Sequence, residues 1–365
     1  MKSWRNYGIT ALVAAIGVSC ADVKESPTAT ASGTGTCGTD PKGMSWEILQ
    51  ESDTLHGTLF STWGRSASDV WAVGATNKDF PEKGPQLLHW DGTTWTRHSS
   101  AATGEMWWVT PGTTEGTLWV AGSQGQILHR GLDGVFSVMQ APNQTQLFGI
   151  FALAEDNVYA VGGPPSCAPG QPCGVIWHYD GKAWSADSAI SETLRSEASW
   201  FKMWGTGPDN LYVVGSAGHI LHFDGKAWSD QPTGVNDQLF TVSGNAALAV
   251  AVGGLGAGVL LENDGTGWKK GKIKGDTLPG LNGVSIAADG SGVTVGSNGT
   301  IWRRCGGTWQ EDTALSNEPL DDLHAVWRGP SGDIFAVGGQ IVMPPFQGGQ
   351  LLHFGLPTNA KKISD

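Results

Sequence analysis

Residues 201–228 read FKMWGTGPDNLYVVGSAGHILHFDGKAW, and this stretch decides the fold. It holds an aromatic apolar run, a Pro-Asp-Asn turn, a second apolar run that ends in glycine, and two further runs joined by Asp-Gly. The same order recurs seven times, and the period is marked by the glycine that closes each second run: Gly74, Gly122, Gly162, Gly215, Gly253, Gly296 and Gly338. Repeats of about 40–50 residues indicate an architecture of stacked supersecondary units.

Each repeat has the composition of four short strands. The runs are about five residues long and rich in aromatic and β-branched residues, which favour strands. Asp-Gly or similar pairs join the third run to the fourth, as at Asp91-Gly92, Asp180-Gly181 and Asp224-Gly225. Such pairs are typical of hairpin turns, because glycine tolerates positive φ. Seven repeats of four strands predict an all-β, seven-bladed β-propeller with four antiparallel strands per blade.

The two ends of the repeat region predict how the ring closes. The seventh repeat, residues 323–354, has only three runs, whereas residues 45–49 (SWEIL) resemble a fourth run without a repeat of its own. We therefore expect the N-terminal strand to complete blade seven, which would remove two open sheet edges.

Two residue types recur at fixed positions in the repeat. Tryptophans open most fourth runs (Trp95, Trp184, Trp228, Trp268 and Trp309), with Phe136 in repeat two, and we expect them between adjacent blades. Histidines recur on the third run (His89, His129, His178, His222 and His353), where Glu262 and Arg303 replace them in repeats five and six. One histidine per blade, away from the axis, does not converge on a metal, so we expect hydrogen bonding near the Asp-Gly turn and no metal site.

The N-terminal region has the pattern of an export signal. A positive start and an apolar segment from Gly8 to Val18 precede Cys20, and this segment is too short to span a membrane. The small residue before Cys20 resembles the lipobox of bacterial lipoproteins, although Gly17 replaces the usual aliphatic residue. The resemblance implies lipidation of Cys20, with an ordinary signal peptide as the alternative. We divide the chain into a signal (1–19), a Ser/Thr/Gly-rich flexible tether (20–43), the propeller (44–356) and a C-terminal tail (357–365).

The remaining cysteines suit an exported protein. With Cys20 lipidated, four cysteines allow three pairings. Cys167 and Cys173 flank a short loop that could close on itself, and Cys37 would then pair with Cys305. Disulfides of this kind belong to oxidising compartments.

Composition restricts the partners. The net charge is −12, and charged residues make up 15% of the chain. Nucleic acid needs a basic footprint, so a nucleic-acid partner is not expected. We expect a monomer that meets the membrane only through its lipid, at the outer membrane or cell surface of a Gram-negative bacterium, or otherwise in the periplasm or secreted.

A candidate binding face follows from loop lengths. The loops between second and third runs are long in repeats one, three and seven (residues 75–85, 164–173 and 340–349) and short elsewhere. Long loops on a short-looped scaffold are often functional. We predict that Phe80, Met343 and Phe346 line a contact patch for a partner, and the open alternative is that the blade-seven loop folds inward and plugs the axis.

The third-to-fourth-run signature, Leu-His-x-Asp-Gly-x-x-Trp, resembles the Asp-box (BNR) repeat of sialidase-type propellers. It is also similar to the propellers of photosystem II assembly factors and of bacterial lipoproteins of unassigned role. A sialidase would need an arginine triad and a tyrosine nucleophile. Arg65 and Arg328 lie at the ends of first runs without a third arginine, and Tyr159, Tyr179 and Tyr212 occupy structural positions.

The sequence therefore favours a non-catalytic, cofactor-free binding or assembly scaffold for an envelope protein or a glycan. The third positions of the first runs are mostly small and neutral, which favours binding over chemistry: Ser61, Trp108, Gly149, Lys202, Thr241, Gly283 and Ala325. The alternative is a carbohydrate-active enzyme, a glycosidase or lyase, whose site the sequence does not reveal.

Overall fold

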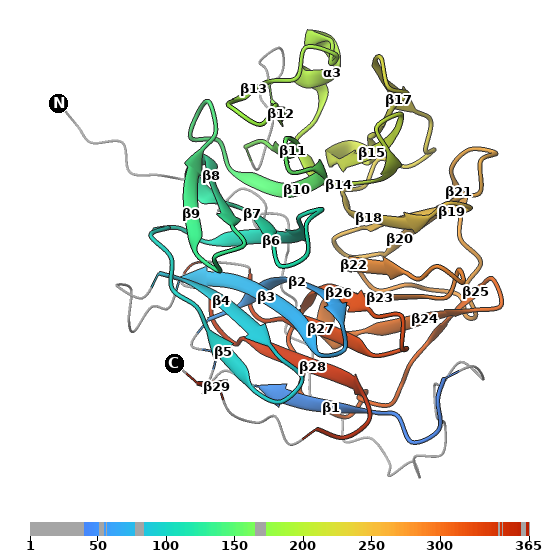
Figure 1. Cartoon of the computed structure of the whole chain (residues 1–365). Helices are drawn as coiled ribbons and strands as arrows, with labels where there is room; N and C mark the ends of the chain where they lie inside the picture. The colour runs from blue at the N-terminus through green and yellow to red at the C-terminus, as the bar shows by residue number, and fades with distance from the viewer. Residues whose placement is uncertain are drawn as a thin grey trace.

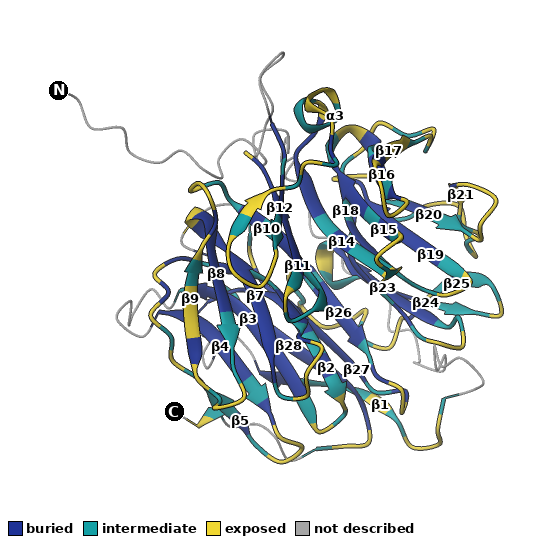
Figure 2. Ribbon diagram, turned by 45° about the horizontal axis from the view of Figure 1, so that its top comes forward, coloured by how far each residue is buried: buried dark blue, intermediate teal, exposed yellow. Residues whose placement is uncertain are grey.

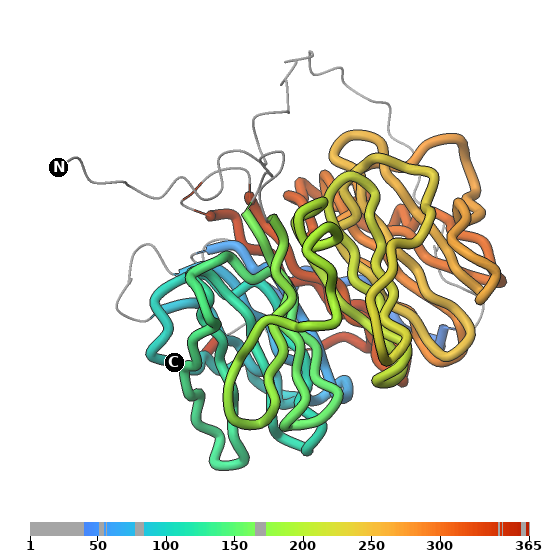
Figure 3. The backbone as a smooth tube through the Cα atoms, turned by 90° about the horizontal axis from the view of Figure 1, so that it is seen from above, coloured from blue at the N-terminus to red at the C-terminus, as the bar shows by residue number. Residues whose placement is uncertain are grey.

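The fold is a ring of seven four-stranded antiparallel sheets, as the repeats predict. The computed structural model describes residues 40–50, 55, 57–76, 84–164, 173–341, 344, 346–358 and 363–364. Figure 1 shows the blades following one another around the ring in chain order, and Figure 3 shows the same path from above. The first strands of the seven blades contact one another in a closed circle around the axis: β2, β6, β10, β14, β18, β22, β26 and back to β2.

Within blades one to six the strands follow one another in chain order, from the first strand at the axis to the fourth strand at the outside. Blades one to three contain β2 (Leu59–Ser66), β3 (Asp69–Thr76), β4 (Pro85–Trp90), β5 (Trp95–Arg97); β6 (Met106–Pro111), β7 (Leu118–Gly122), β8 (Gln126–Arg130), β9 (Phe136–Gln140); β10 (Leu147–Ala154), β11 (Asn157–Gly162), β12 (Val175–Tyr179), β13 (Trp184–Ala186). Blades four to six contain β14 (Trp200–Gly207), β15 (Asn210–Gly215), β16 (Ile220–Phe223), β17 (Trp228–Gln231); β18 (Leu239–Asn245), β19 (Leu248–Gly253), β20 (Val259–Asn263), β21 (Lys269–Lys270); β22 (Leu281–Ile286), β23 (Gly292–Gly296), β24 (Ile301–Cys305), β25 (Thr308–Glu311).

Blade seven combines the two ends of the chain, which confirms the predicted closure. It contains β26 (Leu323–Arg328), β27 (Ile334–Gly338), β28 (Gln350–Gly355) and, as its outer strand, β1 (Ser45–Gln50). β1 pairs antiparallel with β28, from Ser45 opposite Gly355 to Gln50 opposite Leu351, and the two strands lie side by side in Figure 1. The closure leaves no unpaired edge at β28.

The Asp-Gly pairs form the hairpins between third and fourth strands. In blade one, a carboxylate oxygen of Asp91 accepts hydrogen bonds from the backbone N–H groups of Thr93 and Thr94, at 2.8 and 2.7 Å. Gly92 adopts a φ of 92°, which a residue with a Cβ rarely does. The hydrogen bond from the Thr93 hydroxyl, together with these two backbone bonds, lowers the pKa of Asp91 to about 2. The same aspartate turn recurs at Asp180 and Asp224.

Apolar clusters between neighbouring blades form the core. Figure 2 shows the second strands almost wholly buried and most of the exposure on outer strands and loops. Seven of these clusters each contain one aromatic residue from a fourth strand: Trp95, Phe136, Trp184, Trp228, Trp268, Trp309 and, from β1, Trp46. The prediction that these rings pack between blades is confirmed.

Two elements were not expected from the sequence. The short helix α3 (Glu192–Glu197) lies between blades three and four, and the Ser191 side chain caps its N-terminus. β29 (Ile363–Ser364) adds a fifth, parallel strand to blade one beside β5, so part of the predicted C-terminal tail is ordered against the ring. Within the described ranges, no helix has the length and apolarity that crossing a membrane requires.

Candidate functional site: the axial collar

A β-bulge at the start of each first strand shapes the centre of the ring. In β2, Leu59 pairs with Gly74 and Ser61 with Val73, so Phe60 is the extra residue. A bulge inserts one unpaired residue and redirects its side chain. All seven first strands have it at the same position, and the extra residues are Phe60, Trp107, Phe148, Phe201, Phe240, Asn282 and His324. We call this set the axial collar.

The collar side chains contact one another around the axis. Phe60 stacks on Trp107, with ring centroids 4.1 Å apart, and also meets the edge of His324 at 5.9 Å. The chain of contacts continues through Trp107–Phe148, Phe148–Phe201 and Phe201–Phe240, each at 5.5–5.6 Å. Between blades five and seven, hydrogen bonds replace ring contacts. The backbone carbonyl of Asn282 accepts from the Thr241 hydroxyl, and the side-chain amide of Asn282 donates to the backbone carbonyl of Leu323. The result is a collar of five aromatic rings, one histidine and one amide.

A second layer follows the collar by one residue on each first strand. It consists of the seven third positions, Ser61, Trp108, Gly149, Lys202, Thr241, Gly283 and Ala325. Its one charged member, Lys202, donates a hydrogen bond to the Phe148 carbonyl and lies 4.3 Å from the centroid of the Trp108 ring. Both Lys202 and Trp108 are half-buried. Burial lowers the pKa of Lys202 to about 7.

The two layers contain no carboxylate. Glycoside hydrolysis uses a pair of carboxyl groups flanking the sugar bond. The carboxylates that come just before first strands are engaged elsewhere: Glu105 accepts from the Ser123 hydroxyl at 2.7 Å, and Asp322 accepts from the Asn298 N–H at 2.8 Å. These contacts support the short turns between second and third strands. The axial layers thus offer apolar contact and one cation.

The described part of the blade-seven loop contacts the collar through Phe346. The Phe346 side chain is 4% exposed and packs against Phe60 and Trp107, with centroids 5.3 and 5.9 Å apart. Thr58 fixes the loop, because its hydroxyl donates to the carbonyls of Gln340 and Gln347. The sequence left two alternatives for this loop: a partner-contact patch, or a loop that folds inward toward the axis. The Phe346 side chain points inward, onto the collar. Phe80 and Met343 lie outside the described residues, and the role of all three in partner contact stays a prediction.

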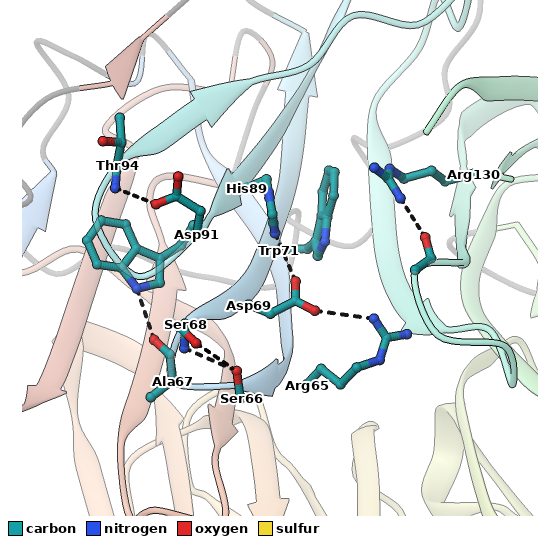
Figure 4. Close-up of polar contacts among 12 residues, drawn as sticks. Arg65, Ser66, Ala67, Ser68, Asp69, Trp71, His89, Asp91, Thr94 and Arg130 are labelled. Atoms are coloured by element: carbon teal, nitrogen blue, oxygen red, sulfur yellow. Dashed lines mark hydrogen bonds and ion pairs between the residues drawn. The ribbon is translucent and has the colours of Figure 1, made fainter. Parts of the chain in front are cut away.

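The repeated histidines each stack on the aromatic residue opposite them on the second strand. The pairs are Trp71–His89, Trp119–His129, Tyr159–His178, Tyr212–His222 and Phe335–His353, with centroids 4.1–4.7 Å apart. In blade one, His89 also bonds Asp69, the first residue of β3, at 2.8 Å, and Asp69 pairs with Arg65 (Figure 4). The expected hydrogen bonding is thus observed. His178 and His222 likewise bond the first residue of their second strands, whereas His129 bonds Glu155 of blade three and His353 bonds Glu47 and Asp333.

One grouping of potential metal ligands occurs within the described part of the chain. Single ligand atoms of Glu197, at the end of α3, and of His219 and Asp230, on blade four, lie within 4.8 Å of one another. His219 Nδ1 bonds an Asp230 oxygen at 3.2 Å, and the two carboxylate residues are exposed. The sequence did not indicate this group, because its members come from a helix end, a turn and an outer strand.

The predicted lipidation and disulfide sites are mostly beyond the described ranges. Cys20, Cys37 and Cys167 lie outside them. Cys173 is buried and Cys305 is half-buried at the end of β24. The pairings Cys167–Cys173 and Cys37–Cys305 and the lipid on Cys20 therefore stay predictions.

Sequence reasoning named none of the collar residues as a site, although a signal was present. Five of the seven repeats carry an aromatic residue directly after the first apolar residue of the first run. In a regular strand these residues would alternate with the third positions and face the opposite side. The bulge removes that alternation, so strand periodicity alone misplaces them.

No protein-family model matches this chain, and no curated protein matches it. Solved structures do. YCF48 bound to a D1 peptide aligns with a TM-score of 0.58 at 15% identity, over 86% of this chain and 97% of that one. YCF48 from Cyanidioschyzon merolae gives 0.60 at 16%, over 85% and 98%. The WD40 propeller domain of Doa1 gives 0.60 at 13%, over 86% and 97%. At these identities the likeness establishes the propeller fold.

Proposed function

We propose that this protein is a non-catalytic binding scaffold of the cell envelope that captures a protein segment at the axial collar. The observation that carries the proposal is the set of seven bulges, which redirect five aromatic side chains into one contiguous collar without a carboxylate. Aromatic side chains provide large contact areas and dominate the energetics of many interfaces. A propeller among its structural neighbours, YCF48, was solved with a bound peptide.

Accessibility supports the collar as the binding surface. Trp107, Phe148 and Phe240 are half-buried, so each keeps part of its ring surface available. Phe346 covers the side next to Phe60 and Trp107. A ligand would therefore enter beside Phe148 and Phe240, on the side of the collar away from the blade-seven loop.

The proposal includes export and anchoring through a lipid on Cys20, with disulfides Cys167–Cys173 and Cys37–Cys305. A charged start, a short apolar segment and the cysteine after Ser19 support it. Cys20→Ser should move the full chain from the membrane fraction to the soluble fraction of the envelope. Retention of the variant in the membrane fraction would contradict lipid anchoring.

The binding role is tested by affinity capture from an envelope extract with soluble residues 21–365 as bait, a form that omits Cys20 and keeps Cys37. The variant Phe148→Ala/Phe240→Ala removes two half-buried collar rings. The matched control, Leu132→Ala/Val138→Ala, removes two apolar side chains that are 73% and 41% exposed on the outside of blade two. We expect a partner that wild type and control retain and the collar variant loses by tenfold or more.

Two results would count against this function. A partner held equally by the collar variant would move the site elsewhere on the ring. A bait that captures no protein would contradict a protein-binding scaffold, and a glycan array probed with the same three baits would then decide for the glycan alternative. The carbohydrate-active enzyme of the sequence analysis gains no support from the two axial layers, because they lack a carboxylate pair.

A further inference from the structure

Lys202 is a cation without an anion in the axial layers. Several arginines, by contrast, form ion pairs with carboxylates: Arg65 with Asp69, Arg303 with Asp40 and Asp312, and Arg304 with Glu262. In the part of the chain that the structure describes, no carboxylate forms an ion pair with Lys202, whose contacts are the Phe148 carbonyl and the Trp108 ring. Holding an ammonium away from bulk water without a counter-ion is unfavourable.

The neighbouring second-layer residue on blade three is a glycine, which leaves room for Lys202. Lys202 lies on blade four and reaches past blade three to Trp108 of blade two. The intervening second-layer residue is Gly149, where an added Cβ would come 3.1 Å from the Lys202 Cα and 2.7 Å from the Phe201 carbonyl. A side chain at Gly149 would therefore disturb the strand that carries Lys202.

Lys202 lies next to the collar, because its ammonium donates a hydrogen bond to the carbonyl of Phe148, a collar residue. Burial lowers the pKa of a second collar residue, His324, and the charge of Lys202 adds a smaller lowering, whereas Asp322 acts in the opposite direction. An incoming ligand that contacts the collar comes within reach of this amine.

We propose that Lys202 binds the carboxylate of a ligand whose flat apolar body lies against the axial collar. The inference rests on the proposed role of the collar as the binding site and names the chemistry of its ligand. An ammonium binds a carboxylate, which carries the opposite charge, more strongly than it binds an uncharged carbonyl such as that of Phe148. A single cation matches a single negative charge, which favours a monocarboxylate over a phosphate.

Two sources can supply this chemistry: a free aromatic acid, or the C-terminal carboxylate of a peptide that ends in an aromatic residue. The probes are therefore 3-phenylpropionate with its amide, and acetyl-Gly-Gly-Phe with its C-terminal amide. Each pair keeps the apolar body and removes only the charge.

The experiment is calorimetric titration of residues 21–365, wild type and variants. Lys202→Met keeps the length and apolar stem of the side chain and removes the charge. Lys226→Met is the matched control, because Lys226 is exposed in the β16–β17 turn of the same blade. We expect wild type and Lys226→Met to prefer at least one acid over its amide by tenfold or more, and Lys202→Met to lose that preference. The probe pair that shows the preference identifies the source.

A second readout separates ion pairing from a change in shape. Because the free amine has a pKa of about 7 and a bound carboxylate raises it, binding at pH 7.5 should take up a proton. The binding enthalpy of wild type should then vary with the ionisation enthalpy of the buffer, and that of Lys202→Met should not. If Lys202→Met does not fold, the acid–amide comparison and the proton uptake of wild type decide the question.

The outcomes separate this inference from the proposed function. Equal affinity of wild type for acid and amide, or an acid preference that survives in Lys202→Met, would overturn the carboxylate site. If neither probe binds while the collar variant still loses a protein partner, the scaffold function stands and the carboxylate inference fails.

Discussion

The glycine that marks each repeat is required for its size. In blade five, a Cβ on Gly253 would lie 1.8 Å from the carbonyl oxygen of Gln238, the residue before β18. The same carbonyl accepts the N–H of Gly254 at 2.9 Å, so the two segments are held together at this point. In all seven blades the residue before the first strand presents its carbonyl within 2.6 Å of the position that a Cβ would occupy. The glycine therefore recurs in every repeat because the end of each second strand lies close to the residue that precedes the first strand.

Replacing Gly253 by alanine should lower the free energy of unfolding by about 2–3 kcal/mol, because the two strands must separate to admit the methyl group. Denaturant titration measures the change. Gly256→Ala is the control, since it lies in the next loop and its Cβ would meet nothing within 4 Å. Equal stability of the two variants would show that the contact relaxes at little cost.

Residue identities also explain the exceptions to the histidine pattern. The five histidines lie opposite an aromatic residue of the second strand, whereas Glu262 and Arg303 lie opposite Val250 and Val293. Since no aromatic ring faces this third-strand position in blades five and six, it holds a charged residue that forms an ion pair. The sequence showed both substitutions, but the pairing across the two strands was visible only in the structure.

At the scale of elements, β1 is held by more than its pairing with β28. Trp46 donates to an Asp312 carboxylate oxygen at 2.9 Å, and Asp312 also pairs with Arg303 at 2.8 Å. Arg303 reaches Asp40 at 2.6 Å and lies 3.9 Å from the Phe354 ring centroid. The charged groups of this network are about 2% exposed. Arg303, the exception to the histidine pattern, therefore ties blade six to the closing strand.

Deleting residues 38–52 should lower the melting temperature by 10 °C or more. It exposes the edge of β28 and leaves Arg303 without Asp40, and breaking a buried ion pair alone costs about 3–5 kcal/mol. Differential scanning fluorimetry provides the measurement. A chain that lacks only residues 21–36 is the control and should melt like wild type. An unchanged melting temperature after the longer deletion would contradict closure by β1.

The seven blades, their strand order and the closing strand could be predicted because each rests on local signals that recur seven times. β29 could not, since a two-residue parallel strand has no periodicity of its own. Ile363 is placed by packing against the cluster that contains Trp95. The collar could be predicted only in part. Its aromatic residues recur in the sequence, but the direction of their side chains depends on the bulge, which the sequence did not reveal.

At the scale of the whole molecule, half-buried histidines make stability depend on pH. Burial lowers the pKa of His98, His222 and His324 below the usual 6.5, and that of His324 falls to about 4. A neutral histidine in the folded state binds protons less readily than the same group in the unfolded chain. Protonation therefore favours unfolding as the pH falls from 6.5 toward 4.

We expect the unfolding free energy to decrease steadily from pH 7 to pH 4.5, with His324 responsible for up to about 3 kcal/mol. His324→Asn gives blade seven the collar residue of blade six and should flatten the decrease. Lys226→Met should follow wild type. Urea titrations across this range measure the effect, and a His324→Asn profile parallel to wild type would contradict it.

The closure by β1 has a further consequence, which concerns the order of synthesis. The contact between Glu47 and His353 joins residues 306 positions apart, so the first strand to leave the ribosome waits for almost the last. Until then the nascent ring has two bare edges, one on each side of the gap, and such edges template pairing with other chains. A chain interrupted before β28 could build six blades and still be an aggregation hazard. For this architecture, completeness of translation is itself a condition of solubility.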